Sequence, residues 1–214
     1  GGMSLGLALN SIYYYQREQY GEFYERPIDD EELIREGKKI AQEIIERLRM
    51  RPELEDVPIL IGLFKQEARN SIVPGSYLQY AVSSPGKNSL GEWVQLNEKY
   101  VSFPMSSPED IYRDINDAFN KFKHEIDLYF SNLTSVIGTG FYKENRIQKL
   151  EVEIPIQFFG TAEIIGFTQY LTGVMLSKLP QDLPVVISIT SMNGPEALIK
   201  KMPNEDEPFV HIYE

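Results

Sequence analysis

Apolar and polar side chains alternate strictly from Leu150 to Phe158, and a long apolar stretch follows Gly160. Strict alternation predicts a strand with one buried and one solvated face, because successive side chains of a strand point to opposite sides of the sheet. Residues from about Thr161 to Leu179 are apolar around most of a helical circumference, which is typical of a core helix. The sequence therefore predicts a strand and a central helix here, and neither contains an obvious reactive group.

Two amphipathic helices are predicted upstream of this pair. The first begins at the acidic run Asp29–Glu32, where negative charge favours a helix N-terminus, and its apolar spacing continues to Pro52. The second begins at Ser107, with Pro108 at the first helical position, and its apolar stripe continues to Phe130. Three main helices are therefore expected.

Apolar and alternating runs predict the strands that separate these helices. They cover residues 57–65, 76–83, 93–103, 135–142, 147–158, 184–191, 196–202 and 209–213. Lys143–Arg146 and Asn193–Gly194 are expected to be hairpin turns. Strands in consecutive runs between helices predict an α+β fold, with a mostly antiparallel sheet and three main helices packed on it. The recurring order is compatible with repeated helix-strand-strand units.

The sequence predicts a short N-terminal segment followed by one domain. Residues 1–28 are expected to be an expression remnant, Gly1–Gly6, followed by a Tyr-rich N-terminal arm. No composition break resembling an interdomain linker interrupts residues 29–214, so we expect a single α+β domain there.

Charge and composition exclude several classes of protein. The formal net charge is -11, and no Lys/Arg stripe opposes it, so we expect no nucleic-acid partner. The basic residues between Lys38 and Arg51 are expected to lie on the solvated face of the first helix. The chain has no cysteine, which excludes disulfides, thiol catalysis and cysteine-ligated metal. No apolar run approaches the roughly 18–20 residues that a membrane span needs.

Histidine is the commonest catalytic base and metal ligand, and the chain has two. His124 falls off the apolar stripe of the second helix, which favours a solvated position. His211 alternates with Phe209 and Tyr213 in the last strand, so packing is favoured over catalysis. Neither has metal-ligand spacing, and we expect no metal and no cofactor.

Paired carboxylates and glycines are the other chemical candidates. Glu151 and Glu153 point the same way on a strand, but they occupy the polar face of an amphipathic strand, where charges simply meet water. Gly138 and Gly140 form a lone G-x-G without a third glycine or a following helix, so a bulge or a close backbone approach in a strand explains them better than a phosphate loop.

Aromatic residues make up 12% of the chain, and tyrosine is the most frequent of them. Tyrosine-rich surfaces suit recognition, because the side chain combines apolar area with a polar tip. Most of these rings are expected to be ordinary core or sheet packing. If a ligand-binding face exists, its expected contributors are Tyr13, Tyr14, Tyr15, Tyr77, Tyr80, Trp93 and His211.

Three blocks of sequence carry a resemblance to a known family. They are PILIGLFKQ at 58–66 with SIVPGSY at 71–77, QFFGTAEIIGFTQ at 157–169 within the stretch 148–174, and KMPNEDEPFVHIYE at 201–214. They resemble the CamS family, the sex-pheromone precursor lipoproteins of Gram-positive bacteria. The resemblance runs from about Asp30 to the last residue, and none of the blocks is a generic catalytic motif.

The resemblance implies a lipoprotein whose pheromone peptide is released from the signal segment. The mature body would remain lipid-anchored at the extracellular face of the cell membrane, and the anchor would be its only membrane contact. The signal segment and the lipobox cysteine are not among these residues, so no part of the chain can be assigned as pheromone. The family supplies no catalytic residue to transfer.

Three hypotheses for function follow. The leading one is an extracytoplasmic, non-enzymatic domain that binds an unknown peptide, cell-wall or protein partner. The first alternative is a cell-wall- or peptide-processing enzyme that uses a carboxylate or His211. The second is a protein-assembly module whose Tyr-rich arm, residues 10–28, docks on a partner or on a second copy.

Overall fold

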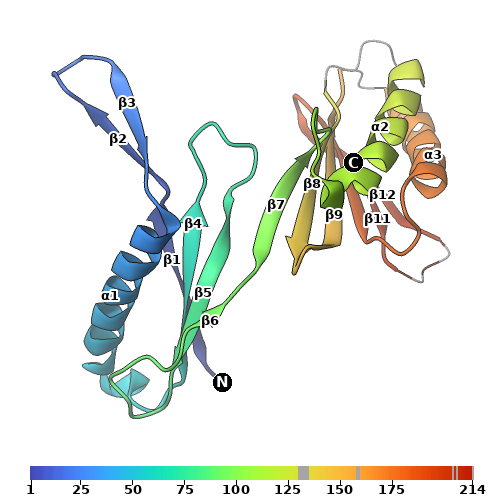
Figure 1. Ribbon diagram of the computed structural model, residues 1–214. Helices are drawn as coiled ribbons and strands as arrows, with labels where there is room; N and C mark the ends of the chain where they lie inside the picture. Colours follow the sequence, from blue (N-terminus) through green and yellow to red (C-terminus); the bar gives the residue numbers. More distant parts are fainter. Residues whose placement is uncertain (130–134, 158–159, 204, 206, 214) are drawn as a thin grey trace. The chain divides into compact units, whose positions relative to one another are not determined.

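The computed structural model describes residues 1–129, 135–157, 160–203, 205 and 207–213. The chain divides into two compact units, Gly1–Lys99 and Tyr100–Glu214 (Figure 1). The sequence predicted one domain over residues 29–214. The boundary falls inside a strand, Glu98–Phe103, rather than in a glycine- or proline-rich linker, so no change of composition marks it.

The N-terminal unit is a four-stranded sheet with one long helix packed against it (Figure 1). The strand order is β1-β4-β5-β6, in which β1 runs parallel to β4 and the other neighbours are antiparallel. The elements are β1 (Met3–Asn10), α1 (Asp30–Arg49), the 3-10 turn η1 (Pro52–Leu54), β4 (Ile59–Gln66), β5 (Gly75–Ser83) and β6 (Val94–Gln95).

Strand β1 contains most of the opening residues that the sequence predicted to be an expression remnant. It pairs with β4 in unbroken register from Met3 to Asn10. Its apolar residues Leu5, Leu7 and Leu9 pack on the core that α1 and β4 share, while the intervening positions are exposed. The alternation is typical of a half-buried strand, and it is as regular as the one in residues 150–158.

The Tyr-rich arm is a two-stranded hairpin that projects from the N-terminal unit (Figure 1). Strand β2 (Ile12–Gln16) pairs antiparallel with β3 (Phe23–Pro27). Within the hairpin, Tyr15 stacks on both Tyr13 and Tyr24 with 5.6 Å between ring centroids. The Tyr15–Tyr24 contact joins the two strands, and cross-strand aromatic pairs stabilise a hairpin that has no third strand.

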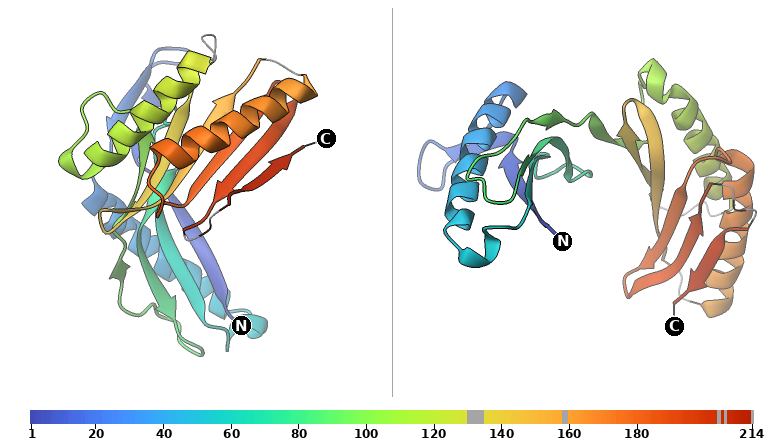
Figure 2. Two further views of the ribbon diagram at one scale, coloured as in Figure 1. Left: turned by 90° about the vertical axis from the view of Figure 1, so that its right-hand side faces the viewer. Right: turned by 90° about the horizontal axis from the view of Figure 1, so that it is seen from below.

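The C-terminal unit is a six-stranded sheet, order β12-β11-β10-β9-β8-β7, with two helices on one face (Figure 2). Strand β9 runs parallel to β10, and the other described pairings are antiparallel. The elements are β7 (Glu98–Phe103), α2 (Asp110–Tyr129), β8 (Ile137–Lys143), β9 (Arg146–Pro155), α3 (Thr161–Lys178), β10 (Val185–Ser191), β11 (Gly194–Lys201) and β12 (Phe209–Ile212).

The core of this unit forms as the alternation predicted. Leu150, Val152 and Ile154 of β9 are buried under the helices, while the charged residues between them are exposed. Both predicted hairpin turns are present between paired strands, β8–β9 and β10–β11. In the first, Glu144 and Asn145 have positive φ values of 48° and 60°, as a tight two-residue hairpin turn requires. The predicted element ends at Phe130 and Phe158 lie outside the described residues.

The α+β class, the three main helices and the mostly antiparallel pairing are confirmed. Each helix is followed by an antiparallel pair of strands: β4–β5 after α1, β8–β9 after α2, and β10–β11 after α3. The helix-strand-strand order therefore recurs in the structure. None of the described helices has the length and apolar character needed to cross a bilayer.

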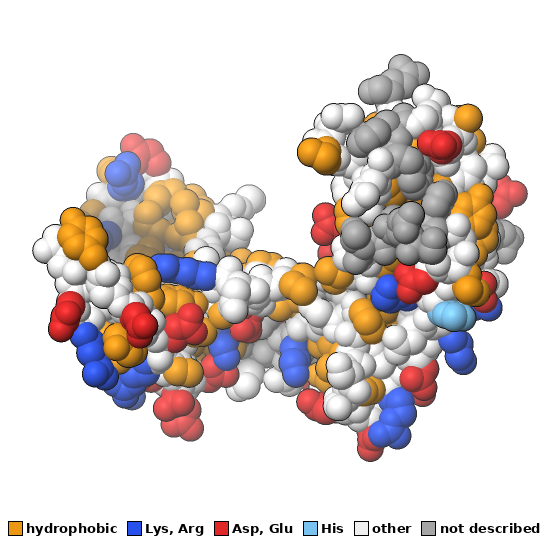
Figure 3. Space-filling view, turned by 90° about the horizontal axis from the view of Figure 1, so that it is seen from above, with side chains coloured by type: hydrophobic (Ala, Val, Ile, Leu, Met, Phe, Trp, Pro, Cys, Tyr) orange, Lys and Arg blue, Asp and Glu red, His pale blue; other side chains and the backbone are white. Residues whose placement is uncertain are grey.

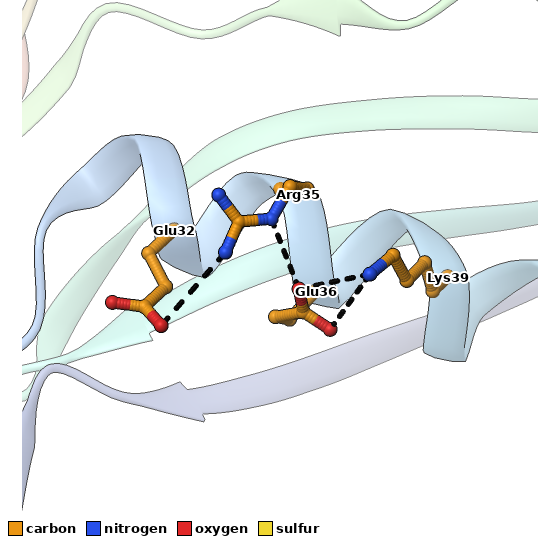
Figure 4. A network of polar contacts seen from close by, with 4 residues as sticks. All are labelled: Glu32, Arg35, Glu36 and Lys39. Carbon is orange, nitrogen blue, oxygen red and sulfur yellow. Dashed lines mark hydrogen bonds and ion pairs between the residues drawn. The ribbon is translucent and has the colours of Figure 1, made fainter.

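The charged surface of α1 fits the prediction except at one residue. Glu32, Arg35, Glu36 and Lys39 form exposed ion pairs along the helix (Figure 4). The pKa of the Glu36 carboxyl lies below its usual value because Lys39 and Arg35 both donate hydrogen bonds to it. Arg49 departs from this pattern, because its guanidinium turns inward onto backbone carbonyls of the neighbouring loops.

Candidate binding site at the base of the β2–β3 hairpin

The residues that could support catalysis are dispersed. His124 is exposed on α2. His211 is exposed on β12, where its ring contacts Phe209 and Tyr213 with centroids 6.4 and 4.7 Å apart. Glu151 pairs with Lys149 on the open face of the sheet. Among the residues that the structure describes, no group of three or more His, Asp or Glu side chains could hold a metal ion.

The predicted aromatic contributors do not form one site. Tyr13 and Tyr15 share one face of the hairpin. Trp93 packs against the core on the α1 side of the sheet, with the Lys38 ammonium 5.3 Å from its ring centroid. His211 lies in the other unit.

Tyr77 and Tyr80 do come together, on the face of the sheet opposite α1. They line a mainly apolar hollow of about 300 Å³ with residues of β1 and β4 and with Leu96 and Glu98. The Tyr77 side chain leans across Gly62 toward Gly6. A Cβ atom would lie 2.9 Å from the ring carbon Cε1 at Gly62 and 2.9 Å from the hydroxyl oxygen at Gly6. The two glycines therefore make room for this ring, which also packs edge-on against Phe64 at 5.1 Å.

Tyr14 lies in a different hollow, which we call the hairpin cleft. The cleft has a volume of about 350 Å³ and is mainly polar. One wall comes from the end of β1 and the start of the hairpin, and the other from the end of β4 and the loop that leads to β5. Its lining residues are Asn10, Ser11, Ile12, Tyr14, Gln66, Glu67, Ala68, Arg69, Ser71, Val73 and Pro74.

Backbone hydrogen bonds fix both walls of the hairpin cleft. Ser11 is buried, its N–H donates to the carbonyl oxygen of Gln66 at 3.3 Å, and its own carbonyl accepts from Ile28 at 2.8 Å. On the other wall, the Glu67 N–H donates to the Pro74 carbonyl at 3.2 Å. Strand ends therefore anchor both walls, and Arg69 lies in the loop that connects β4 to β5.

Arg69 joins the two walls. Its guanidinium carbon lies 4.3 Å from the centroid of the Tyr14 ring, and its backbone N–H donates to the Tyr14 hydroxyl oxygen at 3.1 Å. A guanidinium over a phenol ring is attracted by the negative face of the ring. Tyr14 therefore contacts Arg69 at both ends and sets the position of its charge. No carboxylate of the described residues lies within ion-pair distance of this guanidinium.

The sequence singled out Tyr14 but missed Arg69. A lone arginine in the polar stretch Glu67–Asn70 has no distinguishing spacing. Tyr14 and Arg69 meet because β1 is parallel to β4. The two strands end side by side, at Asn10 and Gln66, and the segments that follow them are neighbours. That relationship is not visible in residues that are 55 positions apart in the chain.

A third hollow lies between α2 and α3, and its polar lining residues are paired with one another. Lys178 pairs with Glu125 at 2.8 Å, and the Tyr170 hydroxyl donates to the Glu125 carbonyl at 2.9 Å. The pKa of Glu125 is lowered by the hydrogen bond from Lys178, and burial raises that of Tyr170. These contacts hold the two helices together. In the hairpin cleft, by contrast, the Arg69 side chain lines the hollow without an ion-pair partner among the described residues. Figure 3 views this end of the N-terminal unit.

The chain matches one protein family and is similar to two solved structures of that family. Residues 1–207 match the family described as CamS sex pheromone cAM373 precursor. The C-terminal domain of the sex pheromone staph-cAM373 precursor from Staphylococcus aureus is 35% identical, with a TM-score of 0.85 over 99% of this chain. The sex pheromone precursor from Lactobacillus salivarius is 32% identical, with a TM-score of 0.89 over 100% of this chain. No curated protein matches.

The comparisons also bear on length and on the opening residues. The chain spans 64% and 62% of those two solved chains. The family match begins at residue 1, so it includes β1, which the resemblance seen in the sequence alone did not reach. Since the match covers nearly all of the sequence and both units, the chain belongs to the CamS family of sex pheromone precursors.

Proposed function

We propose that this chain is a non-enzymatic binding domain of a lipid-anchored pheromone precursor, acting at the extracellular face of the cell membrane, and that the hairpin cleft is its ligand site. The observation that carries the binding role is the Tyr14–Arg69 stack, which holds a cation against a polar hollow. Lipid anchoring and surface location rest on the resemblance to precursor lipoproteins.

The proposed binding role is supported by the character of the cleft. Its walls combine an arginine and a tyrosine, two of the residue types enriched at recognition hot spots, with side-chain amides and two serine hydroxyls. Its volume of about 350 Å³ falls within the range of small-ligand sites, roughly 300–1,000 Å³. The enzyme alternative has less support, because His211 is exposed and its ring contacts only the neighbouring Phe209 and Tyr213 rings among the described residues.

The site can be tested by nuclear magnetic resonance with 15N-labelled protein and a mixed library of peptides and small polar molecules. We expect shifts in the backbone signals of the cleft, and we expect Arg69→Gln to abolish them. Arg47→Gln is the matched control, because Arg47 lies on α1 with 79% of its side chain exposed. Shifts that cluster elsewhere would refute the site. Turnover of a library member that depends on a cleft residue would refute the non-enzymatic role.

A protein-assembly role is the second candidate, and exposed aromatic residues of the hairpin favour it. Tyr20 is 91% exposed, Phe23 68% and Tyr13 59%. Aromatic side chains in such positions are frequent anchors of protein interfaces. Light scattering of the chain with and without residues 12–27 would separate the candidates. An oligomer that becomes a monomer when the hairpin is removed would favour assembly through the hairpin. A chain that is a monomer with and without the hairpin would favour ligand binding.

A further inference from the structure

We propose that the hairpin cleft binds a carboxylate group of an extended peptide, with the Arg69 guanidinium as the anion-binding group. This inference rests on the proposed function, because it names the ligand class of the same cleft. Two observations support it: Tyr14 contacts Arg69 at its guanidinium and at its backbone N–H, and the cleft is lined by further charged and amide side chains.

The Arg69 guanidinium lies over the Tyr14 ring, and none of its N–H groups donates a hydrogen bond to another described residue. The guanidinium carbon lies over the ring at 4.3 Å. All five N–H donors of an arginine lie in the plane of the guanidinium, so stacking on a ring does not consume them. Two parallel N–H groups on one edge match the two oxygens of a carboxylate.

The stack is also preorganised. The Tyr14 hydroxyl accepts the backbone N–H of Arg69, so one tyrosine contacts both the main chain and the charged end of the same residue. A side chain that is already positioned loses less conformational freedom on binding, and the affinity gained for each new hydrogen bond is correspondingly larger.

The charges of the lining favour a carboxylate over a phosphate. Arg69 is the only basic side chain among the lining residues of the hairpin cleft, and Glu67 is the only acidic one. One cation can neutralise one negative charge, but a doubly charged phosphate would keep an excess charge near Glu67. The chain as a whole carries a formal charge of -11, which opposes multiply charged anions further.

The rest of the lining favours a peptide over a small free acid. Asn10 and Gln66 supply side-chain amides, which can pair with the N–H and C=O groups of a peptide backbone. Ile12, Val73 and Pro74 supply apolar wall on which side chains can pack. An anion with no backbone beyond its carboxylate would use only the arginine.

The test uses the full chain of 214 residues and four probes. The probes are N-acetylated tri-alanine with a free C-terminal carboxylate, its C-terminal amide, the same amide with one alanine replaced by glutamate, and inorganic phosphate. Binding is followed at the Arg69 side-chain Nε–Hε signal and at the backbone signals of the cleft. The first and third probes distinguish a terminal carboxylate from a side-chain carboxylate.

We expect at least one carboxylate peptide to bind about tenfold or more tightly than the uncharged amide, because a charge-assisted hydrogen bond is worth about that much. Arg69→Gln should remove the difference. Arg69→Lys should recover only part of it, because lysine keeps the charge but loses the paired donors. Tyr14→Leu should weaken binding while the charge is unchanged, and Arg47→Gln should have no effect.

Equal binding of the carboxylate peptides and the amide would overturn the inference, as would tighter binding of phosphate or an Arg69→Gln variant that binds normally. The proposed function fails separately. If uncharged library members bind in the cleft and the carboxylate peptides do not, the cleft remains a ligand site and only the ligand class is wrong. If no library member and no carboxylate peptide shifts the cleft signals, both proposals are wrong.

Discussion

The guanidinium of Arg49 donates hydrogen bonds to both the backbone carbonyl and the hydroxyl oxygen of Ser83, at 3.3 and 3.1 Å. Ser83 is fully buried at the end of β5, and its hydroxyl donates in turn to the carbonyl of Lys87 at 2.8 Å. The same guanidinium also reaches carbonyl oxygens of Leu54, Glu55, Val57, Ser84 and Lys87. One side chain therefore ties the end of α1 to two loops.

Replacing Arg49 with lysine should destabilise the N-terminal unit by about 2–4 kcal/mol, because lysine cannot supply the same fork of donors and leaves partly buried carbonyls unpaired. Urea unfolding followed by fluorescence measures this directly, since Trp93 is the only tryptophan of the chain and packs on the core of this unit. Arg47→Lys, on the exposed face of the same helix, should change stability by less than about 0.5 kcal/mol. Equal effects of the two variants would contradict the role of Arg49.

Arg49 illustrates what the sequence could and could not predict. Helix α1 was predicted from its acidic start and its apolar spacing, and its outer charges lie in water as expected. The inward turn of Arg49 depends on loops that are more than thirty residues away, at Ser83 and Lys87. Local pattern predicts elements and faces, because each face is set by neighbouring residues. It does not predict which distant loops meet, and the hairpin cleft is made of two such loops.

At the glycine pair of β8, where the sequence predicted a bulge or a close backbone approach, buried aromatic side chains make the close approach. A Cβ atom on Gly138 would lie 2.5 Å from Cε2 of Phe119, a fully buried ring of α2. Gly138→Ala should therefore destabilise the C-terminal unit by about 1–3 kcal/mol through overpacking. Amide hydrogen exchange of the β9 core measures the change.

Gly173 is the matched control for Gly138. It lies inside α3, and a Cβ atom there would meet nothing within 4 Å. Gly173→Ala should stabilise the helix by about 0.5–1 kcal/mol, because alanine loses less backbone entropy than glycine. If Phe119 restricts the site, adding Phe119→Leu to Gly138→Ala should restore part of the lost stability. A stabilising effect of Gly138→Ala would show that Phe119 does not restrict it.

The two faces of β1 should respond oppositely to charge. Leu7 packs toward α1, whereas Ala8 is exposed on the other face. Leu7→Asp should unfold the N-terminal unit or destabilise it by several kcal/mol, roughly the cost of burying an unpaired charge, and Ala8→Asp should be nearly neutral. Trp93 fluorescence in urea again gives the measurement. Two neutral variants would mean that β1 does not contribute to the core of the N-terminal unit.

Tyr142 links alkaline pH to the stability of the C-terminal unit. Its hydroxyl is buried with no hydrogen-bond partner in the described part of the chain, and its ring packs edge-on against Tyr112 at 4.9 Å. Burial, with a smaller contribution from Tyr112, raises the pKa of Tyr142 from 10.0 to about 12. In the unfolded chain the proton leaves near pH 10.0, so the folded state holds more protons between the two values. Stability should therefore be complete below about pH 10 and fall as the pH rises toward 12.

Tyr142→Phe removes this titration and leaves no polar atom to bury. We expect the variant to be as stable as the native chain or slightly more stable at neutral pH, because the lost hydroxyl has no partner to leave unpaired. Between pH 10 and 12 the native chain should lose up to about 2 kcal/mol more than the variant. Urea unfolding across this range, followed by circular dichroism, gives the comparison. Tyr20→Phe is the control, because Tyr20 is 91% exposed in the hairpin. Parallel pH profiles for the native chain and Tyr142→Phe would show that the hydroxyl is hydrated in solution.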